Sequence, residues 1–471
     1  MLDAAKTFAK KRVIKRLLRQ DAEVRAGHPL LPELWGCSVS ADGQLEIDGA
    51  AVGDLVAQFG TPLHVVNDSR LIATFQDFQE NFRNVYPNLI LGTSYKTNPL
   101  PYVISTLHEH GSYAEVISSF ELWLALELGV PVDRIIVNGP GKDDRMLQMA
   151  VQNGVQIINI DGPAEIAKIA RLARQNGIRQ QVGLRVTTSV GWSSQFGLSI
   201  ASGAAIKAFR EISSCPELIP VGLHLHLGTG IQTLDTYRQA VQEVLDFAAL
   251  LDRELGVKIS YFDLGGGFGV PTVRGKSDWD LRMVSLGYPP REPLPASVPK
   301  PKDFAAALAA QFEQLRGLET ESGEPPTVVL EPGRAITSSG QVLLLSVIGK
   351  KQGPDGRPYI IVDGGKNITM PLEWETHKIY AATKMTDTAT QSTNVFGPLC
   401  HPGDVIAKNE PLPELGEGDI LAIMDAGAYF IPNQTNFSNP RPAVVSVSGG
   451  ERKLVRKRER FEDIVSLDVM P

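Results

Sequence analysis

The sequence predicts a (β/α)8 barrel joined to a second, β-rich domain. Eight short apolar runs, each suited to a buried strand, alternate with amphipathic helical segments. Strands regularly separated by helices are typical of a closed parallel barrel. After Arg334 the helical period fades, and short apolar runs predict a separate C-terminal antiparallel β domain, residues 339–471. A doubly wound open sheet remains the alternative, because a strand count does not show whether the sheet closes.

Residues 1–55 are predicted to combine a helical arm, up to about residue 30, with short strands. Turn signals at 41–43 and 47–49 separate alternating runs, which is antiparallel β texture. Because the same texture returns after residue 338, we expect this segment to join the C-terminal domain. The barrel, residues 56–338, would then lie between the two parts.

The predicted barrel follows a first strand at 63–66 and a helix at 69–82. Its eight strands are 89–91, 113–116, 134–137, 155–160, 182–186, 221–225, 261–264 and 327–330. Amphipathic segments such as 143–152 and 236–251 separate them. One long interruption, 271–302, is rich in proline, serine and charge. It follows the seventh strand, so it predicts a lid, a binding loop or a disordered segment over the functional end of the barrel.

Composition excludes several classes of function. The formal net charge of −7 gives no support to nucleic-acid binding. No apolar run is long enough to span a membrane, and the basic run at 6–19 lacks the apolar core of a signal peptide. The three cysteines, Cys37, Cys215 and Cys400, are far apart and fit free thiols in a reducing compartment. We therefore expect a cytoplasmic protein with neither nucleic-acid nor membrane partners.

Chemistry in such a barrel sits at the C-terminal strand ends. The first strand leads to Lys96, which can act as an amine nucleophile toward carbonyls if its pKa is depressed. The alternative is a solvated lysine in a turn. The sixth strand carries His224 and His226 on one side, where an imidazole can cover an aromatic cofactor. A packed core pair or a metal site is the alternative, but no cysteine or carboxylate stands at zinc-ligand spacing, so no metal is predicted.

The last two strand ends supply groups for an anion and a ring. Three glycines, 265–267, expose backbone N–H groups that suit a phosphate, although glycines also form plain tight turns. Their spacing does not match the motifs for nucleotide triphosphates or dinucleotides. Glu331 and Arg334 can serve a protonated ring nitrogen and a phosphate, or can form a surface ion pair. Together these groups are typical of a pyridoxal 5′-phosphate site.

The chain also resembles the fold type III pyridoxal-phosphate decarboxylases (diaminopimelate/ornithine decarboxylase-like), most closely the diaminopimelate decarboxylase branch. The matching segments are 60–63, 94–98, 226–228, 265–267, 331–334, 397–400, 425–429 and 440–443. The resemblance implies an alanine racemase-like barrel with a β domain. It also implies a homodimeric carboxy-lyase of amino-acid metabolism with shared active sites.

The resemblance implies a role for individual residues. Lys96 corresponds to the Schiff-base lysine, His226 to the residue stacked on the ring, and Glu331 to the partner of the pyridine nitrogen, where alanine racemases have arginine. The phosphate would be held by Thr229, Gly266, Gly267, Arg334 and Tyr429. Cys400, from the partner subunit, would protonate Cα after carbon dioxide leaves. Ser118 and Asp161 match small polar positions of the family only loosely.

Three departures from the family pattern concern the substrate. Cys400 is followed by His401 where decarboxylases usually have an acidic residue, Met370 stands where diaminopimelate decarboxylases have arginine, and the 271–302 insert is long. We expect His401, Met370 and Tyr429 to contact the substrate. The sequence thus favours decarboxylation of an unusual or enlarged amino acid. The alternatives are a genuine meso-diaminopimelate decarboxylase of lysine biosynthesis and a non-catalytic binding or regulatory protein.

Overall fold

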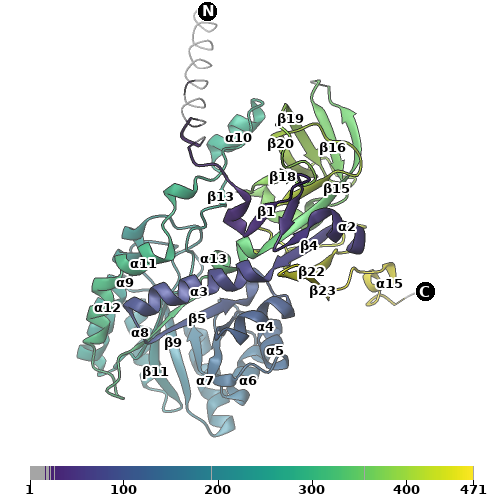
Figure 1. Ribbon diagram of the computed structural model, residues 1–471. Coiled ribbons are helices and arrows are strands. Elements are labelled where there is room, and N and C mark those ends of the chain that lie inside the picture. The colour runs from purple at the N-terminus through teal and green to yellow at the C-terminus, as the bar shows by residue number, and fades with distance from the viewer. Residues whose placement is uncertain are drawn as a thin grey trace, which may run out of the picture.

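The computed structural model describes residues 16, 21, 23–25, 27–192, 194–354 and 356–469. A barrel ringed by helices and a large second sheet make up the molecule (Figure 1). The helical arm predicted for residues 1–30 lies largely outside the described residues. Within them, no helix is both long and apolar enough to cross a membrane.

Eight parallel strands form the barrel, and the sheet closes on itself because β8 pairs with β9. The prediction of a closed barrel is confirmed, and the open-sheet alternative is wrong. The strands are β5 (Leu89–Ser94), β6 (Tyr113–Val116), β7 (Ile135–Val137), β8 (Ile157–Ile160), β9 (Gln180–Thr187), β11 (Leu218–Leu225), β12 (Tyr261–Asp263) and β14 (Thr327–Leu330). A two-residue strand, β10 (Leu198–Ser199), adds to β9.

Helices begin and end at residues that satisfy their free backbone groups. The Asp143 side chain accepts a hydrogen bond from Met146 N at 2.7 Å, and Gly154 ends the same helix with φ +66°. The helices of the barrel domain are α3 (Asp68–Val85), α4 (Pro101–Glu109), α5 (Ser119–Glu127), α6 (Asp144–Asn153), α7 (Pro163–Asn176), α8 (Ala204–Ser213), α9 (Leu234–Leu255), α11 (Pro301–Ala307), α12 (Ala309–Arg316) and α13 (Gly333–Thr337).

An aromatic cluster fixes the glycine loop after β12. Phe268 stacks on Tyr237 with centroids 5.0 Å apart and meets the ring edges of Phe78 and Phe304. The Tyr237 hydroxyl donates to the carbonyl of Gly266 at 2.5 Å. Because these rings are buried, they fix one side of the glycine loop and leave its other side uncovered.

The second sheet is mostly antiparallel, with parallel pairs at β4–β22 and β16–β19. Its strands are β4 (Leu63–Asn67), β15 (Gln341–Gln352), β16 (Pro358–Val362), β18 (Ile379–Ala381), β19 (Gln391–Phe396), β20 (Val405–Leu412), β21 (Ile420–Ile423), β22 (Ala443–Ser448) and β23 (Glu451–Arg456). Because β4 pairs with β15 and β22, a domain boundary after β4 fits these pairings better than the one predicted at residue 56.

The N-terminal strands form a small sheet of their own and share a core with the second domain. They are β1 (Cys37–Val39), β2 (Leu45–Ile47) and β3 (Ala50–Ala51), followed by α2 (Val52–Phe59). Trp35 and Leu45 are fully buried with Leu63 and Leu344 in one apolar cluster. This packing supports the expected association of the N-terminal segment with the C-terminal domain.

The 271–302 insert is ordered and packs against the second domain. Asp280 accepts hydrogen bonds from Arg274 and Arg291, which ties α10 (Asp278–Ser285) to the segments before and after it. The Asn409 side chain donates to the carbonyls of Val284 and Tyr288. In Figure 1, α10 lies beside β18, β19 and β20. None of residues 271–302 lines the cavity at the C-terminal ends of the barrel strands, so the expected role as a lid stays a prediction.

Candidate active site

A cavity of about 250 Å³ opens at the C-terminal ends of the barrel strands. Seven predicted site residues line it: Lys96, His226, Thr229, Gly267, Glu331, Arg334 and Tyr429. They come from four strand ends and from the second domain, so the fold assembles groups that are far apart in sequence. Ser94, Glu115, Asn138, Arg185, Trp192 and Phe196 are also among the lining residues.

Lys96 follows β5 in a short 3-10 turn, η2 (Tyr95–Thr97). Its Nζ lies 2.9 Å from Oε2 and 3.2 Å from Oε1 of Glu115, whose side chain is fully buried. Burial alone would lower the pKa of Lys96, but the charge of Glu115 outweighs burial and raises this pKa above its ordinary value. The predicted depressed pKa is therefore wrong for the site without cofactor. Lys96 is an ammonium that must lose a proton before it can act as a nucleophile.

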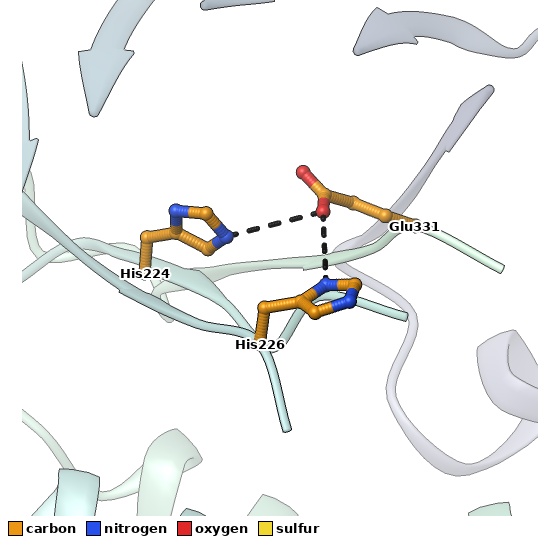
Figure 2. Close-up of side chains that lie close together, drawn as sticks. All are labelled: His224, His226 and Glu331. Carbon is orange, nitrogen blue, oxygen red and sulfur yellow. Dashed lines mark ion pairs between the residues drawn. The ribbon is translucent and has the colours of Figure 1, made fainter. Parts of the chain in front are cut away.

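Two imidazoles flank Glu331, as Figure 2 shows. His224 Nε2 and His226 Nδ1 each lie 3.9 Å from Oε2 of Glu331, which is longer than a hydrogen bond. Burial, Lys96 and Arg185 lower the pKa of His226 to about 3, so its ring is neutral. Gly266 N donates to His226 Nδ1 at 3.3 Å and orients that ring. A neutral, oriented imidazole suits stacking on an aromatic cofactor.

The same three side chains lie close enough to hold a metal ion. A dication there would meet the positive charges of Lys96 and Arg185, which already lower the pKa of both imidazoles. His224 is buried, and neither of its ring nitrogens has a hydrogen-bond partner. A ligand with a polar group fits these surroundings better than a further cation does.

One layer inside the barrel carries most of the polar groups. Apolar side chains of Ile136, Ile157, Tyr261 and Val329 form a cluster of their own. Because side chains alternate along a strand, the residue two positions later points the same way. Those residues are Asn138, Asn159, Asp263 and Glu331. The barrel thus has an apolar layer below and a carboxyl–amide layer at its functional end.

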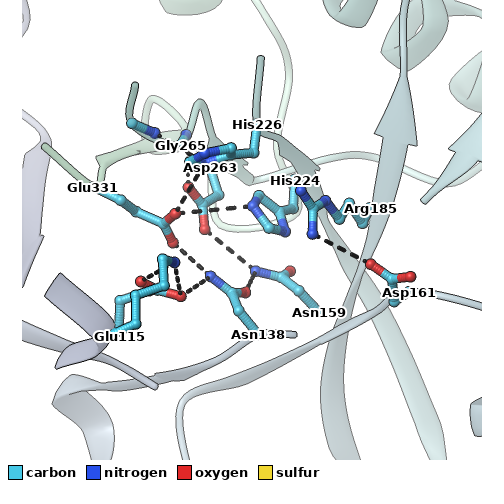
Figure 3. A network of polar contacts seen from close by, with 12 residues as sticks. Glu115, Asn138, Asn159, Asp161, Arg185, His224, His226, Asp263, Gly265 and Glu331 are labelled. Atoms are coloured by element: carbon cyan, nitrogen blue, oxygen red, sulfur yellow. Dashed lines mark hydrogen bonds and ion pairs between the residues drawn. The ribbon is translucent and has the colours of Figure 1, made fainter. Parts of the chain in front are cut away.

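Hydrogen bonds join this layer into one network (Figure 3). Asn138 Nδ2 donates to Glu331 Oε1 at 2.6 Å and to Glu115 Oε1 at 3.1 Å. Asn159 Nδ2 donates to Asn138 Oδ1 at 2.8 Å. Burial, with the charges of Asp263 and Glu115, raises the pKa of Glu331 well above its usual range. Burial opposes ionisation of Glu115 as well, but Lys96 lowers the pKa of Glu115 below its ordinary value. The network therefore holds a proton at Glu331 and a charge at Glu115.

The glycine loop leaves a cradle that side chains would fill. A Cβ on Gly266 would lie 2.0 Å from the carbonyl oxygen of Glu331, and one on Gly267 would lie 2.2 Å from that of Gly228. Gly267 also has φ +90°, which favours glycine. These close approaches explain why glycine stands here.

Cationic and hydroxyl groups border the same end of the cavity. Thr229, Arg334 and Tyr429 line it beside Gly267. The Arg334 guanidinium lies 4.8 Å from the centroid of the Tyr429 ring and is held by Glu375 through contacts of 2.6 and 2.8 Å. The donors fit a phosphate, Glu331 fits a ring nitrogen and Lys96 fits an aldehyde carbon, so the residues present fit pyridoxal phosphate.

Comparison with known proteins decides the family. Residues 69–338 match the profile described as pyridoxal-dependent decarboxylase, pyridoxal binding domain. The chain belongs to this decarboxylase family. The diaminopimelate decarboxylase of Corynebacterium efficiens is 31% identical over 448 residues, covering 91% of this chain and 92% of the relative. That of Aquifex aeolicus is 29% identical, covering 91% and 97%. A crystal structure of diaminopimelate decarboxylase from M. jannaschii with L-lysine has a TM-score of 0.82 at 27% identity, covering 92% and 98%.

The decarboxylase family and its diaminopimelate decarboxylase branch confirm the predicted fold, cofactor and enzyme class. This chain is a pyridoxal-phosphate-dependent amino-acid decarboxylase. The alternative of a non-catalytic binding or regulatory protein is not supported. The relatives also give no support to the predicted unusual or enlarged substrate.

Several predicted site residues do not line the decarboxylase cavity of their own chain. Cys400 is an exposed free thiol. His401 is exposed, and its ring lies 6.3 Å from that of Phe437. Met370 is 42% exposed on the turn η6 (Met370–Glu373). Gly266 lies behind the cavity wall, where it orients His226.

The two loosely matched positions have local structural partners. The Ser118 side chain accepts a hydrogen bond from Glu121 N at 3.2 Å and so caps α5. Asp161 is 3.4 Å from Arg185 Nη1 and accepts a hydrogen bond from Gly197 N. Asp161 thereby helps to orient an arginine that lines the cavity.

The sequence did not reveal an aromatic and cationic part of this decarboxylase site. Arg185 is 8% exposed, and its guanidinium lies 4.4 Å from the centroid of the Phe196 ring. Trp192 stacks near Phe196, with centroids 6.3 Å apart, and lies 6.4 Å from His226. The loop that carries Trp192 and Phe196 has no motif. The only available signal was that Arg185 stands at the end of a predicted strand.

Proposed function

We propose that this enzyme decarboxylates meso-diaminopimelate to lysine. The observation that carries the reaction class is the buried arrangement of Lys96, Glu115 and Glu331 beside a glycine cradle. The assignment of the substrate rests on similarity to diaminopimelate decarboxylases from several organisms, which match more than nine-tenths of this chain. Both ends of the proposed substrate carry charged groups, in keeping with the charged lining of the cavity.

The residues divide the chemical work. When bound, pyridoxal phosphate supplies an electron-withdrawing ring that accepts the electron pair left by the departing carboxylate. Glu115 takes the proton from the Lys96 ammonium and leaves a free amine at Nζ. Glu331 holds a proton where the ring nitrogen would lie, and the neutral His226 would cover one side of the ring against water. The phosphate would be held by Arg334, Thr229, Gly267 and Tyr429.

The working unit in this proposal is a homodimer with shared sites. Cys400 is exposed and does not line its own cavity. Cys400 of a second copy would complete the site and return a proton to Cα. His401 and Met370 of that second copy would contact the distal end of the substrate.

Carbon dioxide release from purified holoenzyme tests the proposal. The panel is meso-diaminopimelate, L-lysine, L-ornithine, L-glutamate and a conjugated amino acid. We expect kcat/KM for meso-diaminopimelate to exceed every other value by roughly a hundredfold or more, about 2.7 kcal/mol of transition-state binding. Faster turnover of another member would overturn the substrate while keeping the reaction class. No release from any member, with cofactor bound, would overturn the reaction itself.

A further inference from the structure

A second cleft, of about 690 Å³, lies between the N-terminal segment, the 271–302 insert and the second domain. None of its lining residues lines the catalytic cavity. Its walls include apolar and aromatic side chains, among them Leu30, Pro290, Tyr380 and Leu412. Because the insert is held by Asp280 and Asn409, the cleft is a built part of the fold.

Glu410 reaches this cleft from β20. The residue is only 7% exposed, yet its carboxylate has no hydrogen-bond or ion-pair partner among the described residues. It also lines a neighbouring cavity of about 320 Å³. Two lysines whose charges act on Glu410 are engaged elsewhere: Lys378 Nζ lies 2.6 Å from Glu292, and Lys276 Nζ donates to the carbonyl of Leu372. A largely buried carboxyl without a protein partner is costly, so a ligand that paired with it would be stabilised.

Two hydroxyls near Glu410 are also unsatisfied. Thr393 stands directly opposite Glu410 on the paired strand β19, so both side chains lie on one side of the sheet. The Oγ1 atoms of Thr393 and Thr376 are buried without hydrogen-bond partners, and Thr376 lines the cavity that Glu410 shares. Thr393 thus offers a second acceptor beside Glu410, and Thr376 offers one in the neighbouring cavity.

Four cations and four carboxylates line the cleft, but every one of these cations is already held by a carboxylate. Its cations are paired, in the sets Arg25–Asp21, Arg291–Asp280, Lys378–Glu292 and Lys384–Asp419. Of the carboxylates that line the cleft, Glu410 and the exposed Asp387 have no such cation. A positively charged ligand with an apolar body fits this balance.

We propose that this cleft binds an aliphatic ammonium compound, with its charged nitrogen on Glu410 and its hydrocarbon chain against Tyr380 and Pro290. Free amino acids such as lysine and diamines such as cadaverine share this chemistry. The site is separate from the catalytic cavity, so it holds whether or not diaminopimelate is the substrate.

Calorimetric titration of the holoenzyme at pH 8 tests the proposal, with cadaverine and L-lysine as probes and pentan-1-ol as the neutral control. Binding at the catalytic site is recognised by a change in the visible absorbance of the cofactor. We expect a further binding site that leaves the cofactor absorbance unchanged. Its affinity for the probes should fall at least tenfold in Glu410→Gln. Asp387→Asn, which removes an exposed carboxylate of the same cleft, should change it less than twofold.

The probes and controls separate the outcomes. A further site for cadaverine alone assigns a diamine, and one for both probes assigns the shared ammonium group. Unaltered carbon dioxide release by Glu410→Gln, with an unchanged thermal transition at pH 5, shows that the variant is folded. Identical isotherms for wild type and Glu410→Gln with both probes, or equal binding of pentan-1-ol, would overturn the proposal.

Discussion

The Lys96 Nζ lies 2.9 Å from Oε2 of Glu115, a carboxylate with no exposed surface. The pair stabilises the charged form of both groups, so Glu115 is the counter-ion of the lysine and the closest acceptor for its proton. The reactivity of Lys96 is thus set by a residue from the neighbouring strand.

Replacing this counter-ion should make the lysine easier to deprotonate. Glu115→Gln keeps the size of the side chain and removes its charge, so the pKa of Lys96 falls. The rate at which apoenzyme captures pyridoxal phosphate, followed by visible absorbance against pH, should reach half its maximum at a lower pH than in wild type. A midpoint that is unchanged or higher would show that Glu115 does not control the lysine.

Glu331 should act on the chemical step more than on binding. Glu331→Gln cannot hold the proton that a ring nitrogen needs, so we expect kcat to fall by roughly a hundredfold or more. KM for substrate should change by less than about threefold, since Glu331 would face the ring nitrogen rather than the substrate. A large rise in KM with kcat retained would contradict this assignment.

Gly266 should not tolerate a methyl group. In Gly266→Ala the new Cβ would lie 2.0 Å from the Glu331 carbonyl, so backbone must move. We expect a loss of about 2–3 kcal/mol in unfolding free energy and at least tenfold weaker cofactor binding. Gly141→Ala is the control, because nothing lies within 4 Å of its Cβ. Equal behaviour of the two variants would argue against a tightly packed cradle.

Shared active sites predict complementation between two inactive variants. Lys96→Ala and Cys400→Ala each remove a group from every site of a homodimer. After mixed refolding, half of the dimers should contain one chain of each kind, with one intact site of two. Carbon dioxide release should recover to about a quarter of the wild-type value. No recovery in mixed dimers of proven composition would place Cys400 outside the partner's site.

Glu121 should make the protein less stable as pH rises. Burial, followed by the nearby charge of Glu115, raises the pKa of Glu121 from 4.5 to about 7. A carboxyl with a raised folded-state pKa favours folding at low pH, and that contribution is lost as pH rises from about 4.5 through 7. The unfolding free energy of Glu121→Gln should therefore rise, relative to that of wild type, by on the order of 2 kcal/mol between pH 5 and pH 8.

Thermal denaturation of both proteins across that pH range measures this difference. Glu127→Gln, an exposed position at the other end of the same helix, is the control variant. A Tm difference between Glu121→Gln and wild type that stays constant with pH would contradict the prediction.

The barrel could be predicted because its signals are local. Each strand is an apolar run, and capping residues such as Asp143 mark where helices start. The placement of β4 could not, because Leu63–Asn67 reads as a buried strand in either sheet. Its partners, 341–344 and 443–447, are distant in sequence, and only tertiary pairing selects them.

The site residues also divide into those that could be predicted from sequence and those that could not. Lys96, His226, Glu331 and Arg334 stand in motifs at strand ends and could be predicted. Glu115 could not, because both sides of a parallel strand are buried and the sequence does not show which residues point inward. The direction of the Lys96 pKa shift depends on that carboxylate, so the direction could not be predicted either.

The most direct test is to locate the covalent link between enzyme and cofactor. Borohydride reduction of the holoenzyme fixes the cofactor to its lysine, and peptide mass spectrometry identifies the position. The prediction is modification of Lys96 alone, lost in Lys96→Ala. Modification of Lys142, the buried lysine paired with Glu165, or of no lysine at all, would contradict the proposed site.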